Sequence, residues 1–151
     1  MSLNVCVYSK LAKASVQEPD DYDFDTQLFI DLLSVEEVDR FFPGRHEGVE
    51  IGVVYDFGMR CEFDLSYGDY NIWRDQLAEL AGKTHSGAFH ELIEFSDSEG
   101  VIGPVVSKKL VVDFSEFEEQ AQNVSDAFHQ IYMEFKRAFE MSADQGAVQF
   151  Q

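Results

Sequence analysis

The first apolar residues of the chain occupy every second position. In LNVCVYS, residues 3–9, Leu3, Val5 and Val7 alternate with polar or mixed side chains. Successive side chains of a strand point to opposite faces, so this period of two predicts a β-strand with one buried face. Four further short apolar runs predict strands: LFIDLL (28–33), VEIGVVYDF (49–57), MRCEFDLS (59–66) and FHELIEF (89–95). The two runs that flank Gly58 predict a hairpin.

Three segments combine helical spacing with start and stop signals. Ser34 has the position of a cap for a helix over 34–42, which Pro43-Gly44 would end. Ser66 is the predicted cap of the next helix, whose apolar residues recur at steps of three and four: Tyr70, Trp73, Leu77 and Leu80. Proline suits the first position of a helix, so Pro104 predicts a helix over 104–114.

The longest periodic segment lies near the C-terminus. Seven apolar residues recur there at alternating steps of four and three: Phe117, Ala121, Val124, Phe128, Ile131, Phe135 and Ala138. This spacing predicts one amphipathic helix of roughly seven turns, with Ser115 as its cap. Phenylalanine and alanine on the stripe favour packing on a sheet over a coiled coil.

The order of these elements predicts the fold class. Strands come first, followed by a helix, a strand and more helices, which is typical of an α+β protein. We expect a single domain over residues 1–151. In it a mainly antiparallel sheet packs against the long C-terminal amphipathic helix and two or three shorter helices.

Composition places the chain among globular proteins. Hydrophobic residues make up 45% of its 151 residues, and phenylalanine alone occurs 14 times, which is enough for a sizeable core. No apolar run approaches the roughly 20 residues that span a membrane, and the first ten residues lack a signal peptide pattern. We therefore expect a cytoplasmic location, with Cys6 and Cys61 reduced and structural.

The formal net charge is −18, and residues 14–64 alone hold 14 acidic and 3 basic residues. Such a field repels nucleic acid, anionic lipid and polyphosphate, so we expect no direct nucleic-acid or membrane partner. It would speed the encounter with a basic protein. The alternative is that the acidity only keeps the protein soluble. The oligomeric state does not follow from the sequence.

The stretch FSDSEGVIGP, residues 95–104, is the main candidate for a site. If a strand ends near Phe95, it forms a strand-to-helix turn whose candidate ligand-binding or interaction residues are Ser96, Asp97, Glu99, Gly100 and Gly103. Two carboxylates beside flexible glycines suit a divalent cation such as Mg, Mn or Ca, with Asp97 and Glu99 as ligands. The structural alternative is that these residues only form a turn and stabilise a helix start.

The helix predicted after Ser66 carries a second candidate. Tyr67 and Arg74 flank the only tryptophan, Trp73, and these residue types are enriched at interaction hot spots. The alternative is a buried stripe, with Tyr67 and Arg74 as its more exposed neighbours. His85 and His90 precede Asp97 along the chain and could lie near it. No nucleophile elbow or phosphate-binding fingerprint is present, so no catalytic residue is assigned.

The segments SYGDYNIWR (66–74) and FSDSEGVIGPVVSKKL (95–110), with the opening MSLNVCVYSK, resemble segments of a loose group of small bacterial proteins without an established activity. The resemblance implies a bacterial, cytoplasmic protein and transfers no catalytic residue.

Two functions fit these observations. The first is a non-catalytic protein-interaction module, such as an inhibitor or immunity-like partner of a basic protein or a mimic of nucleic-acid charge. The second is a metal-dependent enzyme, or a metal- or ligand-binding protein, centred on Asp97 and Glu99. The net charge and the lack of a catalytic set favour the first.

Overall fold

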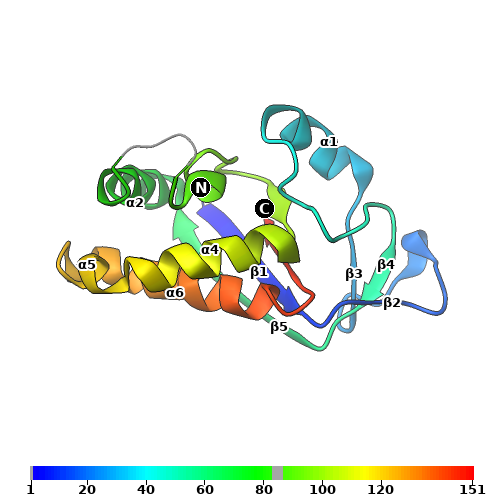
Figure 1. The fold of residues 1–151 in the computed structure, drawn as a ribbon. Helices are drawn as coiled ribbons and strands as arrows, with labels where there is room; N and C mark the ends of the chain where they lie inside the picture. The colour runs from blue at the N-terminus through cyan, green and yellow to red at the C-terminus, as the bar shows by residue number, and fades with distance from the viewer. Residues whose placement is uncertain (1, 83–86) are drawn as a thin grey trace.

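A computed structural model describes residues 2–82 and 87–151. The elements follow in the order β1 (Ser2–Ser9), β2 (Ala12–Lys13), a 3-10 turn (Pro19–Asp21), β3 (Gln27–Phe29), α1 (Leu32–Phe41), β4 (Val54–Asp56), β5 (Met59–Ser66), α2 (Tyr67–Leu80), α3 (His90–Ile93), β6 (Gly100–Ile102), α4 (Pro104–Glu116), α5 (Glu118–Gln122), α6 (Asp126–Ser142) and β7 (Ala147–Phe150) (Figure 1).

The main sheet has four strands in the order β5-β1-β7-β6, and every neighbouring pair is antiparallel. The predicted first strand is confirmed as β1, which lies inside the sheet. Its residues Leu3, Val5 and Val7 are fully buried and face the helices. Alternation along β1 therefore sets which face of the sheet carries the larger core.

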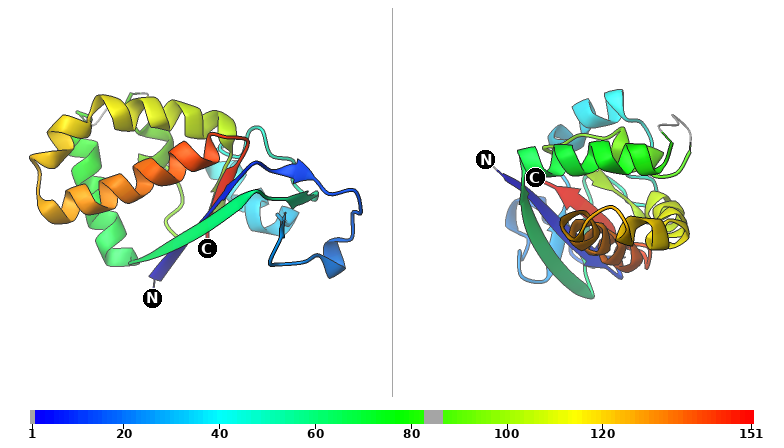
Figure 2. Two further views of the ribbon diagram at one scale, coloured as in Figure 1. Left: turned by 90° about the horizontal axis from the view of Figure 1, so that it is seen from below. Right: turned by 90° about the vertical axis from the view of Figure 1, so that its left-hand side faces the viewer.

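Helices α2, α4 and α6 cover this face (Figure 2). Aromatic side chains fill the space between these helices and the sheet. The ring of Phe135 on α6 lies 4.9 Å from Trp73 on α2 and 5.2 Å from Phe63 on β5, centroid to centroid. Burial of these large rings is the main favourable contribution to the fold. The protein is α+β, as predicted, with the long helix α6 packed on an antiparallel sheet.

A smaller layer packs against the opposite face of the sheet. A three-stranded antiparallel sheet, in the order β2-β4-β3, joins helix α1 there. Its side chains Leu28, Ile30 and Val35 form a second buried cluster with Tyr8 and Ala147 of the main sheet. Both faces of the main sheet therefore contribute to buried cores.

The prediction of one helix through residues 117–138 is wrong. Residues 123–125 separate α5 from α6, and Ser125 caps α6 by accepting a hydrogen bond from the Phe128 N–H at 3.1 Å. The side chain of Val124, which the stripe placed in the core, is 40% exposed. The predicted cap Ser115 lies inside the last turn of α4. The Ser125 side chain caps a new helix, and this replaces the backbone hydrogen bonds that would have continued the preceding helix. The spacing of the apolar residues does not reveal this break.

Other strand predictions also need correction. Residues 89–95 contain the short helix α3 (His90–Ile93) and no strand. Phe89 precedes this helix at a φ of 61°, its ring is wholly buried, and its backbone N–H donates to Asp113. Strands β4 and β5 do not form a hairpin: β5 pairs with β1, whereas β4 pairs with β2 and β3. In both segments, contacts with distant parts of the chain decided the structure.

Helix α1 begins two residues before its predicted cap. The Asp31 side chain accepts from the Leu33 N–H at 2.7 Å, so the cap is Asp31 rather than Ser34, and the preceding strand ends at Phe29. The cap predicted at Ser66 is confirmed, since its hydroxyl accepts from the Asp69 N–H at 3.0 Å. None of the helices in the described residues is long and apolar enough to cross a membrane.

Candidate functional site

Residues 95–99 form a bend that separates helix α3 from strand β6. The predicted strand-to-helix turn is therefore wrong, because a helix precedes the bend and all of β6 intervenes before α4. Asp97 and Glu99 do not flank the start of α4, whose cap position is held by Gly103. The alternative, in which these two carboxylates stabilise the start of a helix, is therefore wrong as well.

The side chain of Ser96 holds the shape of this bend. Its hydroxyl accepts hydrogen bonds from the N–H groups of Ser98 at 3.2 Å and Glu99 at 3.1 Å. Short hydroxyl side chains commonly stabilise turns in this way. The Glu99 side chain is exposed.

On one side the bend is tied to α2 through Asn71. The Asn71 amide nitrogen donates to the Asp97 carboxylate and to the Tyr67 carbonyl oxygen, each at 3.0 Å. The Asn71 amide oxygen accepts from the Arg74 guanidinium at 2.9 Å, and Arg74 also donates to the Phe95 carbonyl oxygen. The structure thus brings the predicted site residue Asp97 next to α2, which carries the predicted site residues Tyr67 and Arg74.

Sequence reasoning missed Asn71, although a signal was present. Asn71 and Arg74 are three residues apart on α2, so they lie one turn apart on the same face. The Arg74 guanidinium also lies 5.0 Å from the Tyr70 ring centroid, and burial raises the pKa of the Tyr70 hydroxyl above its ordinary value. Tyr67 and Arg74 are half-buried rather than exposed.

On its other side the bend borders a hollow of about 200 Å³ against α1, which we call the α1 hollow. Its walls are Glu37, Val38, Phe41, Phe42, Ser96 and Glu99. The two phenylalanines and the valine supply apolar walls, while the two glutamates are exposed. Within residues 2–82 and 87–151, neither glutamate carboxylate has an ion-pair partner.

The nearby arginines do not neutralise these carboxylates. Arg45 donates to the carbonyl oxygens of Glu91 at 2.9 Å and Glu94 at 2.8 Å, and burial lowers the pKa of its guanidinium. Arg74 is directed to a backbone carbonyl and Asn71, as described above. Arg45 and Arg74 therefore form no ion pair with Glu37 or Glu99.

The two candidate glycines serve close packing. Gly100 has a φ of 129°, and a Cβ there would lie 2.6 Å from the Phe95 ring. A Cβ on Gly103 would lie 2.4 Å from the Glu47 carbonyl oxygen. Side chains and backbone of this protein therefore already occupy the space beside both candidate glycines.

The geometry offers little to a metal ion. Among the described residues, no group of three or more histidine, cysteine, aspartate or glutamate side chains could hold one. One oxygen of Asp97 is engaged by Asn71. The His90 imidazole lies 3.5 Å from the Glu94 carboxylate, and His85 lies outside the described residues.

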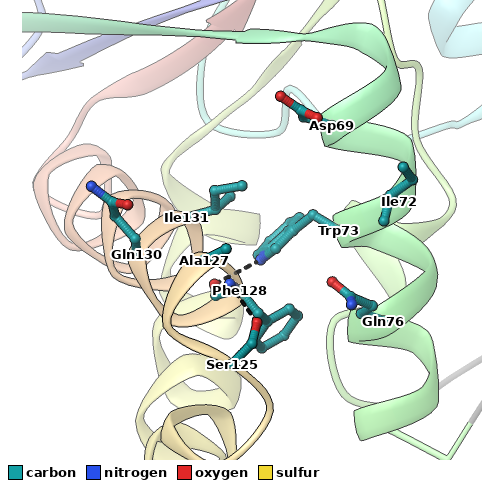
Figure 3. A pocket seen from close by; sticks show the side chains of 9 residues that line it. All are labelled: Asp69, Ile72, Trp73, Gln76, Ser125, Ala127, Phe128, Gln130 and Ile131. Carbon is teal, nitrogen blue, oxygen red and sulfur yellow. Dashed lines mark hydrogen bonds between the residues drawn. The ribbon is translucent and has the colours of Figure 1, made fainter.

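A second hollow, of about 340 Å³, lies between α2 and the start of α6 (Figure 3). The Trp73 indole N–H donates to the Phe128 carbonyl oxygen at 3.2 Å, and the ring is 1% exposed. Trp73 therefore joins two helices and belongs to the buried stripe. The apolar group left open beside it is Ile72, which is 62% exposed.

A polar network around Cys6 was also not predicted from the sequence. The Cys6 sulfur lies 2.9 Å from the Asn4 amide oxygen, 3.1 Å from the Gln151 amide nitrogen and 3.5 Å from the Arg60 guanidinium. Burial raises the pKa of the Cys6 thiol above its ordinary value of 9.0. The thiol is therefore protonated at neutral pH, whereas a nucleophile requires the thiolate.

No protein-family model matches the chain. No curated protein matches it. No solved structure matches it.

Proposed function

We propose that this chain is a non-catalytic interaction protein that binds a basic protein partner through the α1 hollow, in the manner of an inhibitor or immunity protein. The observation that carries the proposal is the placement of two exposed, unpaired carboxylates, Glu37 and Glu99, around apolar walls. We also propose a bacterial origin and a cytoplasmic location, which rest on the sequence alone.

The α1 hollow has the chemistry to take a lysine or arginine side chain. Such side chains lay their methylene stems on apolar surface and keep the charged head in a polar environment. Phe41 and Phe42 offer that surface, and Glu37 and Glu99 offer acceptors for charge-assisted hydrogen bonds. The fixed bend adds preorganisation, since Ser96 and Asn71 already hold its conformation.

The charge of the whole protein supports the same partner. A net charge of −18 attracts a basic surface from a distance and raises the rate of encounter. A metal-dependent activity centred on Asp97 and Glu99 is the alternative. No observation favours it, because the described residues supply no third protein ligand beside them.

Selection of displayed random peptides on the immobilised protein tests the proposal. We expect the selected peptides to be rich in lysine or arginine next to aliphatic residues. The variant Glu37→Gln/Glu99→Gln removes both charges of the hollow and should lose this binding. The matched control Asp75→Asn/Glu79→Gln removes two exposed charges from α2 and should keep it.

Equal binding by the two variants would show that net charge acts without the α1 hollow, and would overturn the proposal. Selection of peptides without basic residues would overturn it too. The on-rate of a selected peptide should fall as salt rises, since exposed charges are screened over about 8 Å at physiological ionic strength.

A further inference from the structure

Strand β5 is an edge of the main sheet, and its outer side is open. It pairs with β1 along Met59–Ser66, and no other strand of the described chain pairs with it. Figure 2 shows it as the outermost strand of that sheet. An edge strand presents unpaired N–H and C=O groups, which form a template for another strand.

The side chains of β5 are also unusually open for a strand of this length. Only Phe63 and Leu65 are partly buried, and Met59 is 62% exposed. Between β5 and α6 lies a hollow of about 380 Å³, whose apolar walls include Met59, Phe63 and Met141. Apolar surface therefore lies directly beside the unpaired backbone.

Charged residues occupy the other face of β5. Arg60, Glu62 and Asp64 pair in register with Tyr8, Cys6 and Asn4, away from the helices. Charged side chains on an edge usually discourage pairing with another strand. Their effect here depends on register, because opposite charges that face each other across two strands attract and like charges repel.

Antiparallel pairing of β5 with a second copy of itself has few possible registers. A two-fold axis perpendicular to the sheet keeps each side chain on its own face. Residues that lie opposite each other must share a face, so the axis passes midway between one residue and the same residue of the second copy. An axis at Glu62 places this residue opposite the partner's Glu62. An axis at Phe63 places Glu62 opposite the partner's Asp64. An axis at Arg60 places two arginines together.

The register centred on Cys61 avoids all of these conflicts. It places Arg60 opposite the partner's Glu62 and, by symmetry, Glu62 opposite the partner's Arg60. On the other face it places Met59 opposite the partner's Phe63, beside the hollow against α6. The overlap between the two copies of β5 covers residues 59–63 and stops before α2 begins at Tyr67.

We propose that two copies of this protein associate through β5 in this register, so that their main sheets become one continuous antiparallel sheet. The order of the charges along β5, the exposed Met59 and the adjacent apolar hollow together favour a second copy of this chain as the binding partner. This surface shares no residue with the α1 hollow, so the two proposals stand or fall separately.

Cross-linking at Cys61 tests the register. This thiol is exposed and would face its own copy, whereas Cys6 is fully buried. A short bismaleimide should therefore join two wild-type chains through Cys61. The control Cys61→Ser/Ser66→Cys moves the exposed thiol along the same strand, where the two copies would lie about 33 Å apart, and it should stay uncross-linked. Equal cross-linking of both proteins, or of neither, would overturn the proposal.

A charge swap tests the same contact without chemical modification. Light scattering at moderate salt, which screens the repulsion between two chains of −18, should show a concentration-dependent dimer. Arg60→Glu should yield monomers, since it brings a second carboxylate opposite the partner's Glu62. Arg60→Glu/Glu62→Arg restores opposite charges and should restore the dimer. A monomeric wild-type protein, or a dimer that Arg60→Glu leaves intact, would overturn the proposal.

Discussion

The side-chain amide of Asn71 lies 3.0 Å from the carboxylate of Asp97, and this contact joins helix α2 to the bend before strand β6. The same nitrogen also reaches the Tyr67 carbonyl oxygen. One neutral residue thus orients the acidic bend, and its loss should affect the stability of the bend more directly than the loss of either candidate carboxylate.

Replacement of Asn71 by alanine should lower the free energy of unfolding by about 1–2 kcal/mol, because it removes several partly buried hydrogen bonds. Urea denaturation measures this loss. The control Asp75→Ala changes an exposed residue of the same helix and should stay within about 0.5 kcal/mol of the wild type. An equal effect of both changes would contradict the proposed role of Asn71.

Tyr70 and Tyr132 provide a matched pair of buried phenols. In the described part of the chain, the Tyr70 hydroxyl has no hydrogen-bond partner, whereas the Tyr132 hydroxyl donates to the Phe114 carbonyl oxygen at 2.6 Å. Tyr70→Phe should therefore stabilise the protein by about 1 kcal/mol, and Tyr132→Phe should destabilise it by about the same amount. Thermal and urea denaturation at neutral pH compare the two. A loss of stability in Tyr70→Phe as large as that in Tyr132→Phe would contradict the prediction.

The same tyrosines predict a pH dependence. Burial raises the pKa of both hydroxyls above the ordinary value of 10.0, so the folded state holds these protons more tightly than the unfolded chain does. Their contribution to stability is complete below pH 10 and is lost as the pH rises through the folded-state values. Urea denaturation from about pH 8 to about pH 11 should show this fall, and Tyr70→Phe should make it shallower. An unchanged slope in that variant would contradict the assignment to Tyr70.

Phe128 should be one of the costliest residues of α6 to truncate. Its side chain is 2% exposed and its ring stacks 5.8 Å from Trp73, so Phe128→Ala should cost about 3–5 kcal/mol. Val124→Ala, in the exposed link before α6, should have a much smaller effect. Thermal melting distinguishes this result from the outcome expected for one continuous helix, in which both changes would be costly.

Metal ions should neither bind nor stabilise the acidic bend. Calorimetric titration of Mg²⁺, Mn²⁺ or Ca²⁺ should give no saturable heat, because Asp97 is engaged by Asn71 and the described residues offer no third ligand. Asp97→Asn/Glu99→Gln is the control for any heat that appears. Stabilisation of the wild type, but not of this variant, would establish the metal site instead.

Patterns in the sequence predicted those parts of the fold that local physics decides. The alternation of residues 3–9 predicted β1, and Ser66 and Pro104 marked the starts of α2 and α4 correctly. The errors arose where distant contacts or weak caps prevailed. Phe89 precedes a helix, with its ring buried and its backbone N–H bonded to Asp113, which lies 24 residues away. Ser125 caps a new helix at a point where the spacing of apolar residues continues without a break.

The candidate site was only partly predictable for the same reason. Ser96, Asp97 and Glu99 could be selected because turn residues and carboxylates stand out in a sequence. The contribution of α1, through Glu37 and Phe41, depends on packing between segments about 60 residues apart. No local spacing relates Glu37 to Glu99, so the α1 hollow becomes visible only in the folded chain.

Strand β7 lies between β1 and β6, although it follows every other strand along the chain. Val5 is paired with Phe150, and β6 joins the sheet only through β7. During synthesis on the ribosome, β1 and β5 can pair while β6 still waits for its neighbour. Closure of the sheet must therefore come after residues 147–150 have emerged, and contacts of such long sequence separation form slowly. Until then, the nascent chain exposes an additional pair of strand edges on which chaperones can act.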